Sequence, residues 1–353
     1  MGLSWRALLL VAMLAAPVAL GGPPRASVAA AGPAVFEGPV APATCGPGSD
    51  PEHGLQGEVP RADRDGGRSR LGYRCNLELV GQHQGEGQSW QNAWYGHCDY
   101  YDTLFPSTQL SPGVQVLDVF DPAHPRLTAH LTTPAMLGPW ESLKVNQRRG
   151  LLGAVSAASP GGNGPLFFDV YDLAQDCAHP VLRASAPVQI PNGHEGNWSP
   201  DGMTYYSAST LTGFISAIDV SNPSAPHLLT VLAQDSHGLS VSDDGNRLYI
   251  ANPGFDGGTA GCHAGTPVRD TSSQSCINGL DILDVSAIQA RQPLPILSRP
   301  KVVGALRWND GSAAQHTIPI SYGGHPYVVF VDEGGAGAPI DVQGPAGAAR
   351  IID

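Results

Sequence analysis

Short apolar runs that end in an aspartate recur along the chain from about residue 113 onward. Runs of this kind between turn residues predict β-strands. Each is followed by a polar turn, usually a proline, and a second apolar run. We expect that second run to be an outer strand, where a missing N–H costs little. The clearest copies are residues 113–131, 164–185, 213–232 and 278–297. The aspartates at the repeated point are Asp118, Asp172, Asp219, Asp284 and Asp353.

A second pattern lies between these copies and consists of a strand, a turn and another strand. Its copies are residues 141–155, 194–208, 237–251 and 316–330. Asp-Gly or Gly-Gly forms the turn in three of the four copies, which is typical of a type I′ hairpin, where both central residues need positive φ. The two patterns together predict repeats of four antiparallel strands.

The repeat length indicates the architecture. His194 and His237 are 43 residues apart, which fits one blade of a β-propeller. The longer step to His316 is explained by an insertion loop at 254–277 and a long outer segment. We therefore predict an all-β protein, a β-propeller of four-stranded antiparallel blades in which about five blades are visible and the last is incomplete.

The incomplete blade predicts either a truncated ring of six to eight blades or a ring that closes in another way. The last run, AARIID, corresponds to the third strand of a repeat. In the other copies a turn and an outer strand follow. Residues 75–81, CNLELVG, would be the outer strand that pairs with a missing C-terminal blade and closes the ring.

The repeats resemble a known family. The runs VQVLDV, ISAIDV, LDILDV and ARIID, with DPAHP and NPSAP after two of them, are similar to the LVIVD-repeat proteins. The resemblance covers residues 72–353. It implies a secreted bacterial β-propeller, but no particular activity, since propellers host unrelated functions.

The N-terminus predicts export. Arg6 precedes an apolar stretch from Ala7 to Leu20, and small residues follow. This is the arrangement of a signal peptide, which we assign to residues 1–31. A retained membrane helix fits less well, because the run is short and contains Pro17. We expect no membrane span after signal removal, a secreted or extracytoplasmic location in the cell envelope, an irregular Gly/Pro-rich segment at 32–71 and a propeller domain at 72–353.

The charge of the chain narrows its partners. The 353 residues include only 19 Lys and Arg, and the net charge is −12. No basic run offers a surface for a row of phosphates, so nucleic acid is not an expected partner. An unidentified protein or small molecule remains the expected ligand.

The six cysteines are predicted to form disulfides, because their number is even and the chain has an export signal. Neighbours in sequence suggest the pairs Cys75–Cys98 and Cys262–Cys276, which leaves Cys45 with Cys177. Sequence alone allows about fifteen pairings.

The repeat also places four polar side chains at equivalent positions of the innermost strands. They are Glu141, His194, His237 and His316. Three imidazoles and a carboxylate at one channel mouth would suit a divalent transition metal, Zn, Cu, Fe or Mn. The alternative is structural: such histidines can bond a neighbouring carbonyl or a channel water. Glu195 should point away from the ring, because side chains alternate along a strand.

The sequence leaves the function open. None of the common catalytic motifs is present, neither GxSxG nor HExxH, nor a P-loop. The first interpretation is a binding or interaction module that presents the channel mouth and residues 254–277 to a ligand. The alternative is a metal-dependent enzyme, an oxidoreductase or a hydrolase. A purely structural envelope protein is a third hypothesis.

Overall fold

The computed structural model describes residues 44–51, 60–85, 91–102, 112–156, 166–187, 193–209, 213–253, 278–308, 314–332 and 349–353. The chain divides into two units, Met1–Thr44 and Cys45–Asp353, and every helix and strand given below lies in the second. The predicted signal peptide and the insertion loop 254–277 lie outside the described residues.

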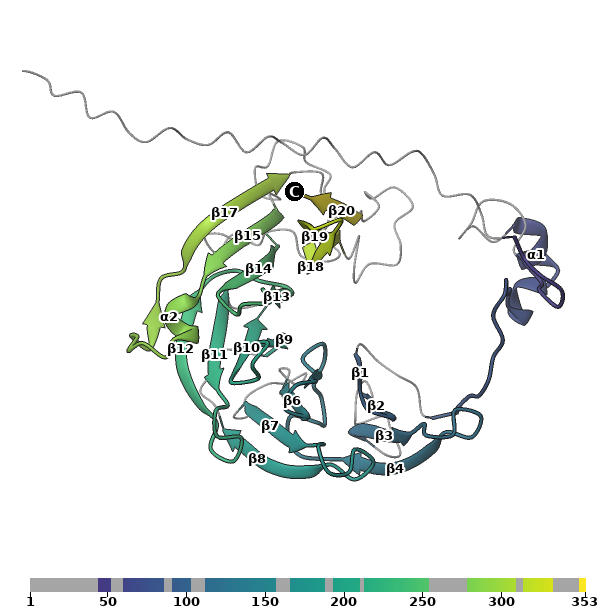
Figure 1. Ribbon diagram of the computed structural model, residues 1–353, viewed down its shortest axis with the longest axis horizontal. Helices are drawn as coiled ribbons and strands as arrows, with labels where there is room; N and C mark the ends of the chain where they lie inside the picture. The colour runs from purple at the N-terminus through teal and green to yellow at the C-terminus, as the bar shows by residue number, and fades with distance from the viewer. Residues whose placement is uncertain are drawn as a thin grey trace, which may run out of the picture. The chain divides into compact units, whose positions relative to one another are not determined.

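The strands of the described residues form five sheets in chain order (Figure 1). The first contains β1 (Asn92–Tyr95), β2 (Cys98–Tyr101), β3 (Val114–Asp118) and β4 (Arg126–Leu131). The second contains β5 (Lys144–Asn146), β6 (Leu151–Val155), β7 (Phe167–Asp172) and β8 (Val181–Pro187). The third contains β9 (Glu195–Trp198), β10 (Thr204–Ser209), β11 (Phe214–Asp219), β12 (His227–Ala233) and β16 (Leu297–Ser298). The fourth contains β13 (Leu239–Val241), β14 (Arg247–Asn252), β15 (Asn278–Asp284) and β17 (Lys301–Trp308). The fifth contains β18 (Ala314–Tyr322), β19 (His325–Asp332) and β20 (Ala349–Ile352).

This topology confirms the predicted fold class. Neighbouring strands are antiparallel and follow chain order, except that β16 adds to β12 in parallel. The first strand of each sheet contacts the first strand of the next, from β1 through β5, β9 and β13 to β18. Four-stranded sheets that follow one another with their first strands side by side are the blades of a β-propeller.

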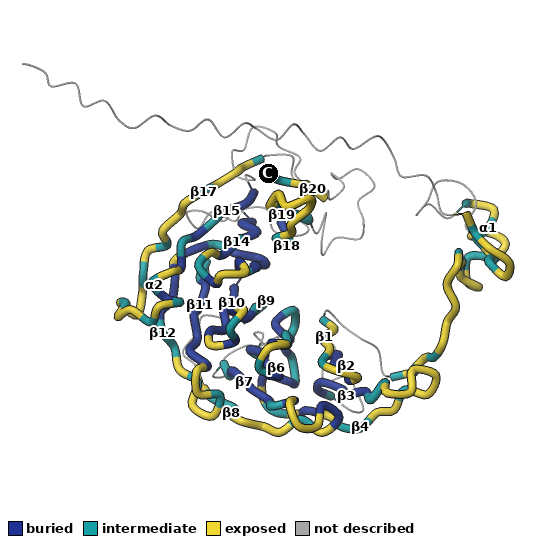
Figure 2. Tube along the Cα trace, in the orientation of Figure 1, coloured by how far each residue is buried: buried dark blue, intermediate teal, exposed yellow. Residues whose placement is uncertain are grey.

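Within the described part of the chain, four clusters of buried apolar side chains fill the spaces between successive sheets. From the first pair of sheets to the last, representative members are Tyr100 with Leu152, Phe168 with Tyr205, Ile215 with Leu239, and Leu280 with Phe330. Burial of one such side chain contributes roughly 1.5–3 kcal/mol. The middle strands β6 and β10 are buried throughout, whereas the outer strands β4, β8 and β17 are largely exposed (Figure 2).

The recurring aspartates have a local structural cause. Each ends the third strand of its sheet, and its Oδ1 accepts a hydrogen bond from the backbone N–H two residues later. The four described pairs are Asp118 with Phe120, Asp172 with Ala174, Asp219 with Ser221, and Asp284 with Ser286. Such side-chain turns favour aspartate. The repeated residue therefore fixes the turn that leads to the outer strand.

The predicted hairpin turns are of two kinds. Gly323 and Gly324 both have positive φ between the paired Tyr322 and His325, so the type I′ prediction is confirmed there. At Asp201-Gly202 and Asp244-Gly245 only the glycine has positive φ. The type I′ prediction is wrong at these two turns. There the aspartate side chain accepts bonds from the turn itself, as in Ser242 Oγ to Asp244 Oδ1 at 2.6 Å.

The segments outside the sheets differ from the prediction in part. Residues 60–71 contain the short helices α1 (Arg61–Asp65) and η1 (Arg68–Leu71), and α2 (Ser286–Gln289) follows β15. Residues 75–81 form no strand with the described sheets, and Leu77 is 78% exposed. No helix of the described part combines the length and the apolar composition that a membrane span requires.

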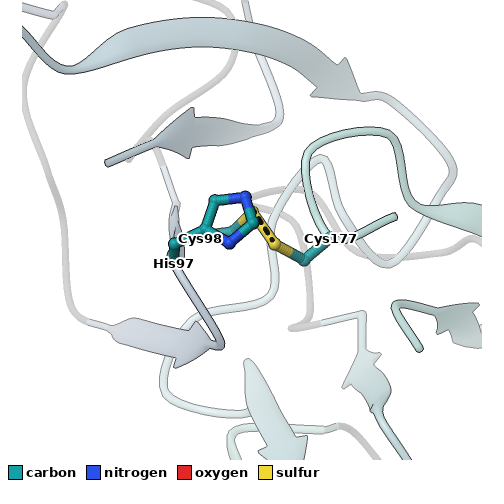
Figure 3. Close-up of side chains that lie close together, drawn as sticks. All are labelled: His97, Cys98 and Cys177. Atoms are coloured by element: carbon teal, nitrogen blue, oxygen red, sulfur yellow. Dashed lines mark hydrogen bonds between the residues drawn. A yellow bond between two sulfur atoms is a disulfide. The ribbon is translucent and has the colours of Figure 1, made fainter. Parts of the chain in front are cut away.

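Two disulfides occur among the described residues, Cys45–Cys75 and Cys98–Cys177. The predicted pairs Cys75–Cys98 and Cys45–Cys177 are therefore wrong. Backbone pairing of Asp50 with Arg74 brings the first two cysteines together. Cys98 opens β2, and Cys177 lies in the turn of the next sheet against it (Figure 3). Cys262 and Cys276 lie outside the described residues.

Candidate metal centre

The repeat places two histidines at the same point of successive inner strands. His194 directly precedes β9, and its backbone N–H donates to Ala208 O at 2.9 Å. His237 precedes β13 and donates in the same way to Ala251 O at 2.8 Å. Each hydrogen bond ties the histidine to the second strand of its sheet. The equivalent spacing in the sequence therefore becomes an equivalent position in space.

Glu141 joins these histidines from the second sheet. An isolated parallel bridge pairs Glu141 with Glu195, the residue after His194. Its Oε2 lies 3.1 Å from His194 Nε2 and 3.6 Å from His237 Nε2, and the two Nε2 atoms are 3.1 Å apart. The three side chains are 13%, 21% and 11% exposed, in the order Glu141, His194, His237. Three ligand-type atoms from three sheets thus converge at a mostly buried point.

Neighbouring groups orient two of these three side chains. His237 Nδ1 lies 2.7 Å from the backbone oxygen of Ala314. A carbonyl oxygen only accepts hydrogen bonds, so Nδ1 carries the proton, and in a neutral ring the Nε2 lone pair faces the cluster. Gln315 Nε2 donates to Glu141 Oε1 at 2.8 Å. The other oxygen of Glu141, Oε2, is the one that meets the imidazoles. Such outer contacts are usual around metal ligands.

The electrostatics favour an ionised carboxylate. Burial raises the pKa of the Glu141 carboxyl, but the hydrogen bond with His194 and the charges of His194, His237 and Lys144 outweigh burial. The pKa of Glu141 therefore lies below its ordinary value. A single proton on one Nε2 can form a hydrogen bond to only one of the two ligand-type atoms close to it. A cation between the three atoms would serve all three.

The spacing of the atoms fits a metal ion. Ligands about 2.0–2.2 Å from a tetrahedral metal are separated by roughly 3.3–3.6 Å. The distances of 3.1, 3.1 and 3.6 Å between the three atoms are close to this range. Two imidazoles and one carboxylate suit Zn, Cu, Fe or Mn better than Ca or Mg, which prefer oxygen ligands.

His316, the fourth predicted ligand, does not join the other three. A β-bulge interrupts the pairing of β18 with β19 between Ala314 and His316, and bulges re-aim side chains. Gln315 reaches Glu141 instead, and His316 Nδ1 lies 2.8 Å from Glu195 Oε1. Glu195 is buried and takes no part in the cluster, as its alternating position predicted.

The structure adds residues that the sequence pattern did not indicate. Gln315 and the carbonyl of Ala314 come from the bulged start of β18, and no repeat position marks them. The ring of Trp140, which has a positive φ of 52°, lies 5.5 Å from that of His194. A second group of ligand-type residues contains His97, Cys98 and Cys177. The two sulfurs of that group are joined in a disulfide and offer no thiolate, so the Glu141 group is the better candidate.

Comparison with known proteins finds similarity of structure only. No protein-family model matches this chain, and no curated protein sequence matches it significantly. Among solved structures, the periplasmic gluconolactonase of Pseudomonas aeruginosa has 16% identity and a TM-score of 0.46 over 72% of this chain. The hydrazine synthase of Kuenenia stuttgartiensis has 13% identity and a TM-score of 0.46 over 78%, and the β-propeller domain of Cps50 from Myceliophteria thermophila has 10% and 0.41 over 67%. The chain spans less than two thirds of each, 66%, 65% and 63% of their lengths respectively.

Proposed function

We propose that this protein is an extracytoplasmic β-propeller that binds a divalent transition metal through Glu141, His194 and His237. The observation that carries the proposal is the convergence of one carboxylate oxygen and two imidazole nitrogens, all within 4.8 Å of one another. The three atoms come from three sheets. Their meeting point is mostly buried, where an uncompensated carboxylate would be costly.

Two further features support the proposed location and the proposed repeat family. The disulfides Cys45–Cys75 and Cys98–Cys177 suit an oxidising compartment outside the cytoplasm. The aspartate-ended strands suit membership of the LVIVD-repeat family. A protein or small-molecule partner at the channel mouth or at residues 254–277 remains part of this proposal.

One observation favours a metal-dependent enzyme as the second candidate. The group supplies three protein ligands, which is the number that catalytic zinc sites use while keeping a position open. A metal with an open position can activate water or polarise a carbonyl. Glu141, His194 and His237 would hold such a metal, and neighbouring groups orient two of these ligands. Gln315 fixes the carboxylate, and the Ala314 carbonyl fixes the His237 ring.

The test is metal content by elemental analysis, with and without added Zn²⁺, in the wild type and in a His194→Ala, His237→Ala double variant. The wild type should hold one equivalent that the variant lacks. The matched control is the His124→Ala, His179→Ala double variant, because these two histidines are exposed and lie in outer turns. The control should keep the metal. A folded double variant of His194 and His237 that keeps the full metal content would overturn the proposal.

A further inference from the structure

Beside the proposed metal centre lies a second place where possible metal-ligand atoms converge. Three residues meet there, each one position further along an inner strand than a residue at or beside the first site. Glu195 follows His194, Gly238 follows His237, and His316 follows Gln315. The Glu195 side chain is 3% exposed and His316 is 23% exposed. The two residues belong to the third and fifth sheets, and Gly238 belongs to the fourth.

The absence of a side chain at Gly238 is what lets these donors meet. A Cβ at this position would lie 2.1 Å from Glu195 Oε2, 2.3 Å from the backbone oxygen of Gln315 and 2.6 Å from His316 Nδ1. All three distances are shorter than real Cβ contacts. A carboxylate oxygen, a carbonyl oxygen and an imidazole nitrogen therefore all pack against the backbone of Gly238.

Three of these ligand-type atoms lack hydrogen-bond partners within the described part of the chain. Glu195 Oε1, Glu195 Oε2 and His316 Nδ1 are buried and have no hydrogen-bond partner among the described residues. Glu195 Oε1 and His316 Nδ1 are 2.8 Å apart but lack hydrogen-bond geometry. Burying a carboxylate that accepts no hydrogen bond costs free energy, and a bound cation would offset this cost.

We infer that Glu195, His316 and the carbonyl of Gln315 form a second divalent-cation site next to the first. Ligands about 2.1 Å from an octahedral ion are roughly 3.0 Å apart, close to the 2.8 Å between Oε1 and Nδ1. This site would offer two oxygen ligands and one nitrogen ligand, whereas the first offers one oxygen and two nitrogens. In terms of hard and soft ligands, the second site is therefore the harder of the two. It should therefore prefer Mn²⁺ to Zn²⁺ more strongly than the first site does. The inference goes beyond the proposed function, and its test uses the first site only to hold Zn²⁺.

The test loads the full-length exported protein with one equivalent of Zn²⁺ and then titrates Mn²⁺, with free Mn²⁺ followed by electron paramagnetic resonance. The wild type should take up one equivalent of Mn²⁺. Glu195→Gln should weaken Mn²⁺ binding at least tenfold and keep the Zn²⁺. The exposed Glu78→Gln is the matched control and should bind as the wild type does.

A second variant guards against a folding defect in the first. His316→Ala removes the imidazole ligand and should abolish Mn²⁺ uptake, with the circular dichroism spectrum unchanged. The His194→Ala, His237→Ala variant should lose Zn²⁺ but still bind Mn²⁺, which separates the two sites. No Mn²⁺ uptake by the wild type, or unchanged uptake by folded Glu195→Gln and His316→Ala, would show a buried ion pair only and overturn the inference.

Discussion

The Nε2 atoms of His194 and His237 lie 3.1 Å apart, although the two residues belong to different sheets. A carboxylate oxygen of Glu141 lies 3.1 Å from the first nitrogen and 3.6 Å from the second. Since His237 Nδ1 contacts a carbonyl, its Nε2 is available as an acceptor or a ligand. The arrangement is therefore suited to holding a shared proton or a cation.

Metal binding should stabilise the folded protein. A ligand at a hundred times its Kd adds about 2.7 kcal/mol to the free energy of unfolding, so Tm should rise by on the order of 5 °C. Differential scanning fluorimetry with added Zn²⁺, and then with a chelator, measures this shift. His194→Ala should remove most of the rise, whereas His124→Ala should retain it. An equal rise in both variants would place the ion elsewhere.

Gln315 is expected to act by positioning Glu141. Loss of its amide in Gln315→Ala frees the carboxylate to rotate, and removal of such an outer contact typically weakens metal affinity about 10- to 100-fold. Isothermal titration with Zn²⁺ measures the change. The exposed Gln292→Ala serves as control and should bind with wild-type affinity. Wild-type affinity in Gln315→Ala would mean that the hydrogen bond does not hold the ligand in place.

The disulfide between Cys98 and Cys177 should matter more for stability than the one between Cys45 and Cys75. It spans 79 residues rather than 30 and joins the first two sheets. The loop-entropy model gives about 4.5 kcal/mol for the longer loop and about 3.6 kcal/mol for the shorter. Paired Cys→Ser variants, unfolded in urea, test this order. A larger loss from the Cys45, Cys75 pair would contradict it.

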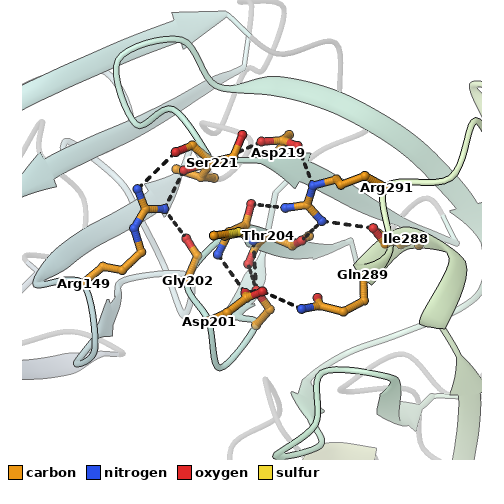
Figure 4. Close-up of polar contacts among 12 residues, drawn as sticks. Arg149, Asp201, Gly202, Thr204, Asp219, Ser221, Ile288, Gln289 and Arg291 are labelled. Atoms are coloured by element: carbon orange, nitrogen blue, oxygen red, sulfur yellow. Dashed lines mark hydrogen bonds and ion pairs between the residues drawn. The ribbon is translucent and has the colours of Figure 1, made fainter.

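Asp219 and Arg291 should make stability depend on pH. Arg291 Nε lies 2.6 Å from Asp219 Oδ2, and the same guanidinium donates to Thr204 Oγ1 (Figure 4). Burial raises the pKa of Asp219, but its hydrogen bonds with Ser221 and the Arg291 charge outweigh burial and lower it. The contribution of this carboxylate is therefore present above its unfolded-state pKa and is lost as pH falls through the lower folded-state pKa.

Asp219→Asn tests this pair. At pH 7 the variant should lose about 2 kcal/mol of stability, the order expected when a charged hydrogen-bonding partner is removed. As pH falls below the lowered pKa of Asp219, wild type and variant should converge. Urea unfolding at pH 7 and at a series of lower pH values provides the measurement. A difference that stays constant with pH would show that the asparagine perturbs packing rather than charge.

The local pattern of apolar and polar residues predicted the strands well. It predicted contacts between distant segments of the chain poorly. Apolar runs ending in Asp118, Asp172, Asp219 and Asp284 predicted the third strand of four sheets, because the aspartate closes a turn with its own backbone. Disulfide pairing was predicted from neighbours in sequence and was wrong. Cys98 instead meets Cys177 because successive blades pack against each other.

The candidate site shows the same division. Repeat position alone brought Glu141, His194 and His237 onto one list, and the structure places their ligand atoms together. Repeat position also predicted His316 as a ligand of this cluster. The β-bulge beside Gln315 turns His316 away from the other three residues. Such a bulge has no clear sequence signal in this segment, since it depends on how β18 pairs with β19.

The sequence by itself determined the all-β class, the four-stranded repeat and the aspartate turns, because these follow from apolar periodicity and from contacts within a few residues. Only the tertiary structure decided which cysteines pair, that Gln315 rather than His316 reaches Glu141, and that Gly238 leaves room for Glu195 to meet His316. Those outcomes depend on how side chains from separate sheets approach one another. Distances of this kind are set by packing across the blades, which the linear order of residues does not encode.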